Sequence, residues 1–258
     1  MAEIRECRAV VLDLFDTIVT WNPELMPQVH RFDREGRPIA IRSTALETFA
    51  VLQQVCGERY LREHYLDAHD AVLAEIYAER SNDMPVEITC LERFMRILNR
   101  LEFGAAGAEE LANRLRAVHM GWVRKVTAAP AARVAAVEWI AQRYRLGLLS
   151  NFDDGETGHM IVADAGVDAL FETVVISADI GLRKPHPQSY HHLLETMSLA
   201  AEEILFVGDD PLCDVFGPNR VGMRTAWINR QQKPLPEGVS TPDLIIGDLA
   251  ELPAALGL

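Results

Sequence analysis

Short apolar runs alternate with amphipathic stretches through the second half of the chain, from Pro130 onward. Each run has the length of a strand, and the stretches between them repeat apolar residues every three or four positions, as an amphipathic helix does. Strands separated by helices of this length are typical of βαβ units and a parallel sheet. The pattern predicts strands over residues 146–149, 173–177, 204–207, 225–228 and 243–246, and helices over 131–144, 158–165, 188–197 and 214–221.

The first half of the chain begins with one more strand, predicted over residues 8–13, and then changes character. Few Val-Ile runs follow, and apolar spacing predicts helices over 60–78, 88–101 and 111–122, with a polar turn or hairpin over 31–38. We therefore predict an α/β fold in two parts. Residues 1–20 and 127–258 would form a doubly wound parallel sheet, and residues 21–126 a mostly helical cap domain inserted after the first strand.

Composition narrows the class of protein. The formal net charge of −13 disfavours nucleic acid and anionic membranes as partners. Four scattered cysteines without Cys-x-x-Cys spacing indicate neither a zinc site nor a disulfide framework. The N-terminus lacks the pattern of a signal peptide, and no apolar stretch approaches the roughly 20 residues that span a bilayer. We expect a cytoplasmic protein with a small-molecule substrate, and the sequence carries no signal for its oligomeric state.

Polar residues stand at or just beyond the ends of four predicted strands. Asp13 follows the first strand, Ser150 the second and Asp209 the fourth, and Lys184 lies shortly after the third. Because the carboxyl ends of parallel strands share one edge of a sheet, these side chains should meet in one pocket. A carboxylate nucleophile, a hydroxyl, a cation and further carboxylates are the groups that phosphoryl transfer requires.

The residues around these four positions form ordered motifs. They are Asp13-x-x-x-Thr17 after an apolar strand, Leu148-Leu149-Ser150-Asn151, Arg183-Lys184-Pro185-His186-Pro187, and Gly208-Asp209-Asp210 with Asp214 five residues after Asp209. With these motifs in this order, nearly the whole chain resembles the haloacid dehalogenase-like hydrolase superfamily, in the subclass with a helical cap inserted after the first motif. The resemblance implies a Rossmann-like core and an active site built from the motif residues.

The resemblance also implies a role for each motif residue. Asp13 would be the nucleophile, forming an ester intermediate with the substrate. Ser150 and the backbone N–H of Asn151 would bind a phosphate oxygen. Lys184 would neutralise the transferring group and hold the nucleophile. Thr17 would form a hydrogen bond within the first loop and fix its geometry.

A magnesium site is the second implication of the resemblance. Mg²⁺ would bind Asp13, Asp209 and the backbone carbonyl of Phe15, because it prefers carboxylate and carbonyl oxygens. Asp210 and Asp214 would be further ligands or would orient metal-bound water. Asp214 could instead cap the helix that follows it.

Phe15 departs from the phosphatases of this superfamily. These enzymes usually carry a second Asp two positions after the nucleophile, which protonates the leaving alcohol and later activates water. An aromatic side chain cannot move a proton, so Phe15 could only contact the substrate. The 2-haloacid dehalogenases also place an aromatic residue there and follow their second-motif Ser with Asn, and a departing halide needs no proton. They hold the substrate carboxylate with a cap arginine, a role open here to Arg31, Arg34, Arg37 or Arg42.

The fourth motif favours the phosphatase interpretation. Several carboxylates brought together without a cation would repel one another. We therefore expect a Mg²⁺-dependent phosphatase that acts on a small phosphorylated metabolite through an aspartyl-phosphate. One alternative is a metal-free 2-haloacid dehalogenase that acts through an aspartyl ester. Another is a catalytically impaired member that binds a ligand, which Phe15 motivates and the retained Asp13, Ser150, Lys184 and Asp209 oppose.

Overall fold

The computed structural model of the protein describes residues 6–32, 35–81 and 86–258. The chain divides into two compact units. The α/β unit comprises Met1–Trp21, Pro85–Glu87 and Ala128–Leu258, and the helical unit comprises Asn22–Met84 and Ile88–Thr127. The short segment at 85–87 joins the α/β unit although it lies between two helices of the helical unit, which the sequence did not indicate.

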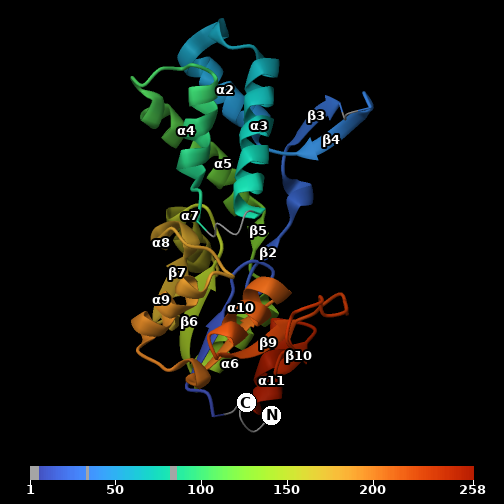
Figure 1. The fold of residues 1–258 in the computed structure, drawn as a ribbon, viewed down its shortest axis with the longest axis vertical. Coiled ribbons are helices and arrows are strands. Elements are labelled where there is room, and N and C mark those ends of the chain that lie inside the picture. Colours follow the sequence, from blue (N-terminus) through green and yellow to red (C-terminus); the bar gives the residue numbers. More distant parts are fainter. Residues whose placement is uncertain (1–5, 33–34, 82–85) are drawn as a thin grey trace. The chain divides into compact units, whose positions relative to one another are not determined.

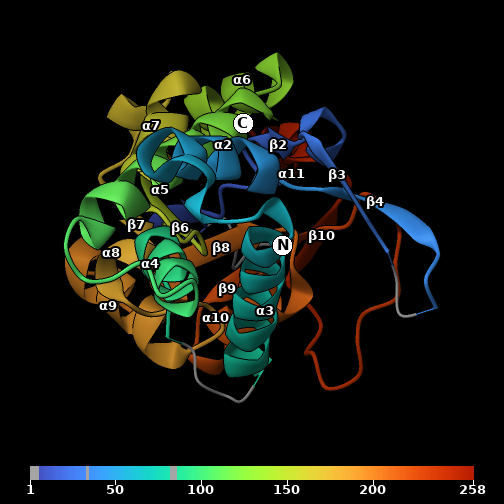
Figure 2. The same ribbon diagram turned by 90° about the horizontal axis from the view of Figure 1, so that it is seen from above.

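A six-stranded parallel sheet forms the centre of the α/β unit (Figures 1 and 2). Its order is β10-β9-β8-β1-β6-β7, so the first strand lies in the middle, between β8 and β6. The predicted strands are confirmed to within about one residue at each end. They are β1 (Ala9–Leu12), β6 (Arg145–Ser150), β7 (Thr173–Ile176), β8 (Ile204–Gly208), β9 (Arg224–Ile228) and β10 (Leu244–Ile246).

The strand order places the connecting helices on both faces of this sheet. From β1 the chain moves outward to β6 and β7, then returns to β8 and moves outward on the other side. Because parallel crossovers are right-handed, this reversal puts α6 and α7 on one face and α9 and α10 on the other. The helices are α6 (Ala131–Ala141), α7 (Gly155–Asp164), α8 (Ser177–Ile180), α9 (Pro187–Met197), α10 (Gly217–Arg220) and α11 (Leu252–Leu256).

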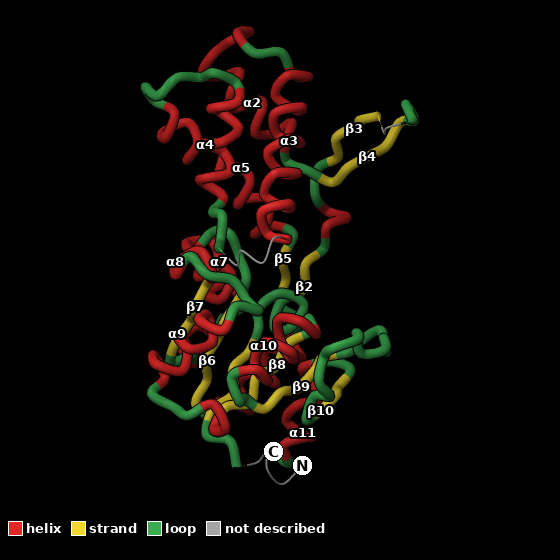
Figure 3. Tube along the Cα trace, viewed as in Figure 1, coloured by secondary structure: helices red, strands yellow, loops and turns green. Residues whose placement is uncertain are grey.

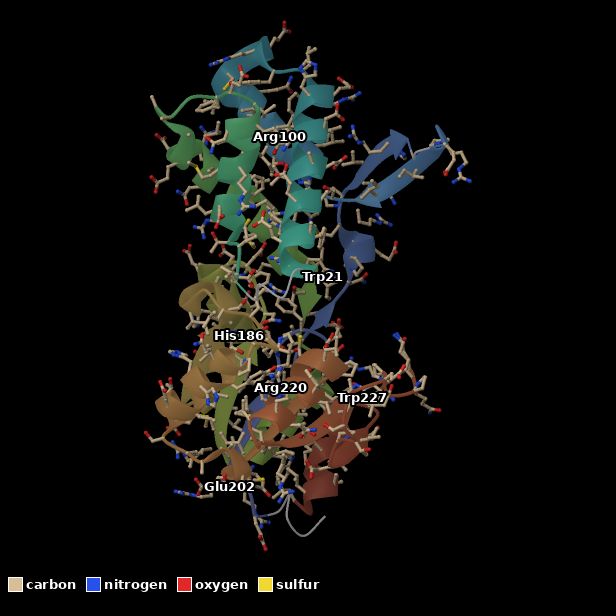
Figure 4. All side chains as sticks on the ribbon, viewed as in Figure 1. Trp21, Arg100, His186, Glu202, Arg220 and Trp227 are labelled. Atoms are coloured by element: carbon tan, nitrogen blue, oxygen red, sulfur yellow. The ribbon has the colours of Figure 1, made fainter. Side chains whose placement is uncertain are left out.

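Apolar packing fixes α9 against the sheet. Tyr190 and Met197 of α9 are buried in one core cluster with Val11 of β1 and Phe206 of β8. A Cβ at Gly147 of β6 would lie 2.8 Å from the Met197 sulfur and 3.2 Å from Val11, so a larger residue there would require the Met197 side chain to move. The first turn of α9 is also specified locally, because its N-cap residue His186 (labelled in Figure 4) accepts a hydrogen bond from the Gln188 N–H at 3.2 Å.

The helical unit contains four helices and a hairpin, which Figure 3 separates by colour. The helices are α2 (Ala45–Cys56), α3 (Arg62–Ser81), α4 (Cys90–Arg100) and α5 (Ala108–Lys125), and the hairpin pairs β3 (Gln28–Phe32) with β4 (Pro38–Arg42). The strands β2 (Thr20–Trp21) and β5 (Thr127–Ala128) pair where the chain leaves and rejoins the α/β unit. No helix among the described residues is long and apolar enough to span a membrane.

Several elements differ from the prediction, and two of them have a clear physical reason. The helix α2 was missed, because its buried face includes the small or polar Ala45 and Thr48 beside Phe49 and Leu52, which weakens the apolar period. The helix predicted over 214–221 is instead a π-helical turn at Pro211–Phe216 followed by α10. The wider turn allows Asp214 to point back under the strand end.

Candidate active site

Asp13 and Lys184 form the buried centre of the candidate site. Asp13 directly follows β1, and its backbone N–H bonds the Val207 carbonyl at 2.9 Å, which continues the β1–β8 pairing by one residue. Its side chain is 10% exposed, and the Lys184 side chain is 2% exposed. The Lys184 Nζ lies 2.8 Å from Asp13 Oδ1 and 2.7 Å from Asp214 Oδ1. Residues from three loops therefore meet at the sheet edge where the sequence predicted a pocket.

The charge of Lys184 depends on these two carboxylates. Burial alone would lower its pKa, but Asp13 and Asp214 outweigh burial and raise it above the usual lysine value. Burial raises the pKa of Asp214, and Lys184 offsets this only in part. The single positive charge of Lys184 therefore balances only part of the negative charge of two buried carboxylates.

Asp209 is the third carboxylate of the cluster. One oxygen atom each of Asp13, Asp209 and Asp214 lies within 4.8 Å of the others. Burial, together with the negative charges of Asp13, Asp16 and Asp210, raises the pKa of Asp209 to about 7. Carboxylate oxygens at this spacing, with more negative than positive charge, are a donor set that suits Mg²⁺.

Asp210 lies outside this group of three. Its Oδ1 accepts hydrogen bonds from the backbone N–H groups of Leu212 at 2.9 Å and Cys213 at 2.8 Å, so its carboxylate caps the turn that follows β8. The sequence assigned such capping to Asp214 as an alternative role. Asp214 instead accepts the Asp210 N–H on Oδ2 and keeps Oδ1 for Lys184.

Asn151 holds the lysine loop through its side chain. Its Nδ2 donates to the Lys184 carbonyl at 2.9 Å, and its Oδ1 accepts the Lys184 N–H at 2.7 Å. The sequence predicted a role only for the backbone N–H of Asn151. The paired side-chain contacts give this residue a second function, which is to set the position from which Lys184 reaches the carboxylates.

Two hydroxyl groups at the site have no hydrogen-bond partner within the described part of the chain. Ser150 at the end of β6 is 1% exposed and Thr17 is 0% exposed, and neither side-chain oxygen is paired. The loop hydrogen bond expected for the Thr17 side chain is therefore not formed within the described part of the chain. Buried polar atoms are rarely left unpaired, so both hydroxyls are available to a ligand.

Phe15 packs among aromatic side chains of the same unit. Its ring centroid lies 5.0 Å from that of Phe152 and 6.3 Å from that of Trp21, in tilted and T-shaped arrangements. On the far side of the nucleophile loop, Asp16 and Asp209 line a pocket of about 490 Å³ together with residues of the loop after β9. The Trp227 indole (labelled in Figure 4) donates to the Asp209 carbonyl at 2.9 Å and fixes that backbone.

The candidate substrate arginines belong to the helical unit. Arg42 on β4 donates to the Met26 carbonyl at 3.1 Å and to Glu24 at 2.5 Å. Arg31 pairs with Asp67 and Asp70, and Arg37 with Glu35. Arg34 lies outside the described residues. A substrate role for Arg42 stays a prediction.

A buried polar cluster beside Lys184 had no signal in the sequence. The Glu87 side chain is 0% exposed, and its Oε2 lies 2.5 Å from Arg183 Nη1 and 2.5 Å from Ser177 Oγ. The Glu87 N–H also bonds the Gly181 carbonyl at 2.9 Å. Ser177 in turn accepts the Phe152 N–H at 2.8 Å. Glu87 thus connects the segment before Lys184 to the segment after Asn151.

Comparisons with known proteins agree with this fold. The model of the haloacid dehalogenase-like hydrolase family matches residues 7–222. The chain belongs to this family and is thus a hydrolase by class. A phosphoserine phosphatase of Thermus thermophilus is 32% identical over 148 residues, which are 57% of this chain and 59% of that protein. Haloacetate dehalogenase H-2 of Moraxella is 36% identical over 102 residues, 40% of this chain and 45% of that protein.

The matches to these curated relatives span about six tenths or less of the relatives' own length. A solved structure of a 2-haloacid dehalogenase from Pseudomonas syringae pv. Tomato DC3000 has a TM-score of 0.68, 21% identity, and coverage of 97% of this chain and 98% of that chain. This likeness confirms the α/β fold alone. Relatives of both chemistries match the chain, so they leave the choice between phosphatase and dehalogenase to the site.

Proposed function

We propose that the protein is a Mg²⁺-dependent phosphatase of a small phosphorylated molecule, with Asp13 as the nucleophile. The observation that carries this proposal is the group of three neighbouring carboxylates, with Asp13 and Asp214 buried and paired with Lys184, and Asp209 half-buried beside them. A phosphate dianion approaching such a group would be repelled. A bound Mg²⁺ would supply the positive charge that offsets this repulsion and polarises the phosphoryl group.

The side chains of the α/β unit would share the remaining work. Asp13 would attack phosphorus, and the bond from phosphorus to the leaving oxygen would break, which yields an aspartyl-phosphate and an alkoxide. Lys184 holds the Asp13 carboxylate through Oδ1 and places a positive charge beside the transferring group. The unpaired hydroxyls of Ser150 and Thr17 would donate to phosphoryl oxygens. Water would then hydrolyse the aspartyl-phosphate and restore Asp13.

Phe15 limits which substrates this site would turn over. With no carboxylic acid at that position, the alkoxide would leave without a proton from the enzyme. Good leaving groups should therefore react much faster than simple alkyl alcohols. We further propose that the helical unit acts as the cap that selects the substrate, since all four motifs lie on the α/β unit.

Metal-free 2-haloacid dehalogenation is the second candidate. Phe15 and the Ser150-Asn151 pair favour it, since a halide leaves without a proton and Asp13 could attack carbon as well as phosphorus. It would leave the carboxylates of Asp13, Asp209 and Asp214 close together without a metal ion between them, which is why we place it second.

One paired screen tests the proposal. Phosphorylated metabolites, p-nitrophenyl phosphate and 2-haloacids are assayed in parallel with Mg²⁺ and with EDTA, using Asp13→Asn as the inactive control. Phosphate release that requires Mg²⁺ is expected. Halide release that persists in EDTA, with no phosphatase activity in Mg²⁺, would establish the second candidate. A ligand that raises the Tm without any turnover would establish the impaired binding member.

A further inference from the structure

The loop between Asp13 and Thr17 contains a backbone conformation that its sequence disfavours. Asp16 has a φ of +54°, in the left-handed region that glycine adopts readily and other residues adopt only at a cost. Such conformations persist where surrounding contacts hold them in place, and they concentrate at functional sites. A contact from outside the loop is therefore expected to hold Asp16 in this conformation.

Arg230, from the loop after β9, makes that contact. Its Nη2 donates a hydrogen bond to the Asp16 carbonyl, and its Nε donates to Asp248 Oδ2 at 3.1 Å. Asp248 is itself fixed, because it accepts Arg133 Nη2 at 2.9 Å and the Ala250 N–H at 3.1 Å. The Arg133 side chain is 7% exposed. Arg133 and Asp248 thus form an anchor, and Arg230 connects this anchor to the carbonyl of Asp16.

We propose that Arg230 is a positioning residue for catalysis, which keeps Asp16 in the left-handed turn and thereby sets Asp13 and Thr17 in register. The inference rests on the proposed roles of Asp13 and Thr17 at the reacting group. Asp16 lies between them, and the Thr17 hydroxyl has no hydrogen bond of its own to hold it. Without Arg230 the turn would relax toward ordinary backbone angles and move the Thr17 hydroxyl and the Phe15 carbonyl.

The anchor offers a matched control. Arg133 and Arg230 both bind the carboxylate of Asp248, but of the two only Arg230 contacts the nucleophile loop. Arg230→Ala should lower kcat by about 10- to 100-fold, as expected for a displacement near 1 Å at a reacting group. KM should change by less than about threefold, because Ser150 and Lys184 stand on other loops. Arg133→Ala should lower the Tm and leave kcat within about twofold.

A second substitution separates positioning from general stability. In the Arg230→Ala background, Asp16→Gly removes the steric cost of the positive φ, so the turn can form without the arginine. The kcat of the double variant should be at least about fivefold higher than that of Arg230→Ala. Asp16→Ala removes the same charge and keeps a Cβ, which disfavours the positive φ, and it should recover little. Arg230→Lys lacks the planar guanidinium that donates to both partners. Its kcat should lie between those of the wild type and Arg230→Ala.

Hydrogen exchange measures the same effect without turnover. Amides of residues 13–19 should exchange faster in Arg230→Ala than in the wild type, and should be unchanged in Arg133→Ala. If the wild type releases halide rather than phosphate, the proposed function fails and these expectations apply to halide release. Wild-type kcat and unchanged exchange in Arg230→Ala would overturn the inference, as would equal recovery by Asp16→Gly and Asp16→Ala.

Discussion

Replacing Phe15 with Asp tests whether a missing proton donor limits the enzyme. The substitution supplies a carboxylic acid at the position where the superfamily's phosphatases usually carry one. Asp13, Asp209 and Asp214 lie nearby, and their negative charges would raise the pKa of a new carboxyl beside them. A larger fraction of that carboxyl would therefore be protonated near neutral pH and able to donate.

Two opposing effects set the expected magnitude. Loss of the ring contacts with Phe152 at 5.0 Å and Trp21 at 6.3 Å should cost about 1–3 kcal/mol of stability, at about 0.5–1.5 kcal/mol for each aromatic pair. A positioned general acid contributes about 10²–10⁴-fold to a rate. Because the surrounding site did not evolve around this acid, we expect a smaller gain than this range, about 10-fold or more, and only for poor leaving groups.

The assay compares leaving groups. We would measure kcat/KM for p-nitrophenyl phosphate and for a simple alkyl phosphate, in Mg²⁺, with the wild type, Phe15→Asp and Phe15→Asn. The Asn variant loses the same ring contacts but cannot donate a proton at neutral pH. The alkyl-to-nitrophenyl ratio should rise about 10-fold or more in Phe15→Asp alone. Equal ratios in both variants would refute the reasoning and would indicate that Phe15 acts through packing.

Three further predictions follow from the site. Asp13→Asn should lower turnover at least about 10³-fold with an unchanged circular dichroism spectrum, and substantial activity in the folded variant would rule out covalent catalysis by Asp13. Asp209→Asn should raise the Mg²⁺ concentration needed for half-maximal activity at least about 10-fold, and an unchanged requirement would show that Asp209 is not a ligand. Glu87→Ala should lower the free energy of unfolding by about 3 kcal/mol in urea titration, the lower end for a broken buried ion pair, since Arg183 is 22% exposed. Glu87→Gln, which can keep the Ser177 bond, should cost less, and losses below about 1 kcal/mol in both would contradict the assigned contacts.

The strands of the sheet and the polar residues at its carboxyl edge could be predicted from the sequence. Every residue of β1 and β8 is buried, and both strands are therefore short apolar runs between helical patterns. The limits of such a run, and the polar residue that follows it, can be read from the sequence. The positions of Asp13 and Asp209 at strand ends could therefore be predicted from the local pattern alone. Their proximity came from one rule, that the carboxyl ends of parallel strands share an edge.

Contacts that depend on distant loops could not be predicted in this way. Arg230 meets the carbonyl of a residue 214 positions away, and Glu87 meets Arg183 across 96 positions. Neither belongs to a motif, and no periodicity links them. Asn151 was identified by its motif, but its side-chain bonds to the Lys184 backbone depend on the path of a loop that the sequence does not specify.

The balance of charge is the strongest reason to prefer metal-dependent chemistry despite Phe15. Within this group, the buried Asp13 and Asp214, the half-buried Asp209 and one lysine leave two negative charges in excess when all are ionised. Either protons or a divalent cation can remove that excess, and the raised pKa values of Asp209 and Asp214 show the tendency toward protons. A site that only attacked carbon in a haloacid would need Asp13 and its lysine, and a half-buried Asp209 held beside two other carboxylates would be a cost without a use. Retention of Asp209 beside Asp214 is therefore expected of an enzyme that binds a divalent cation, and Phe15 then restricts the substrates that such an enzyme can use.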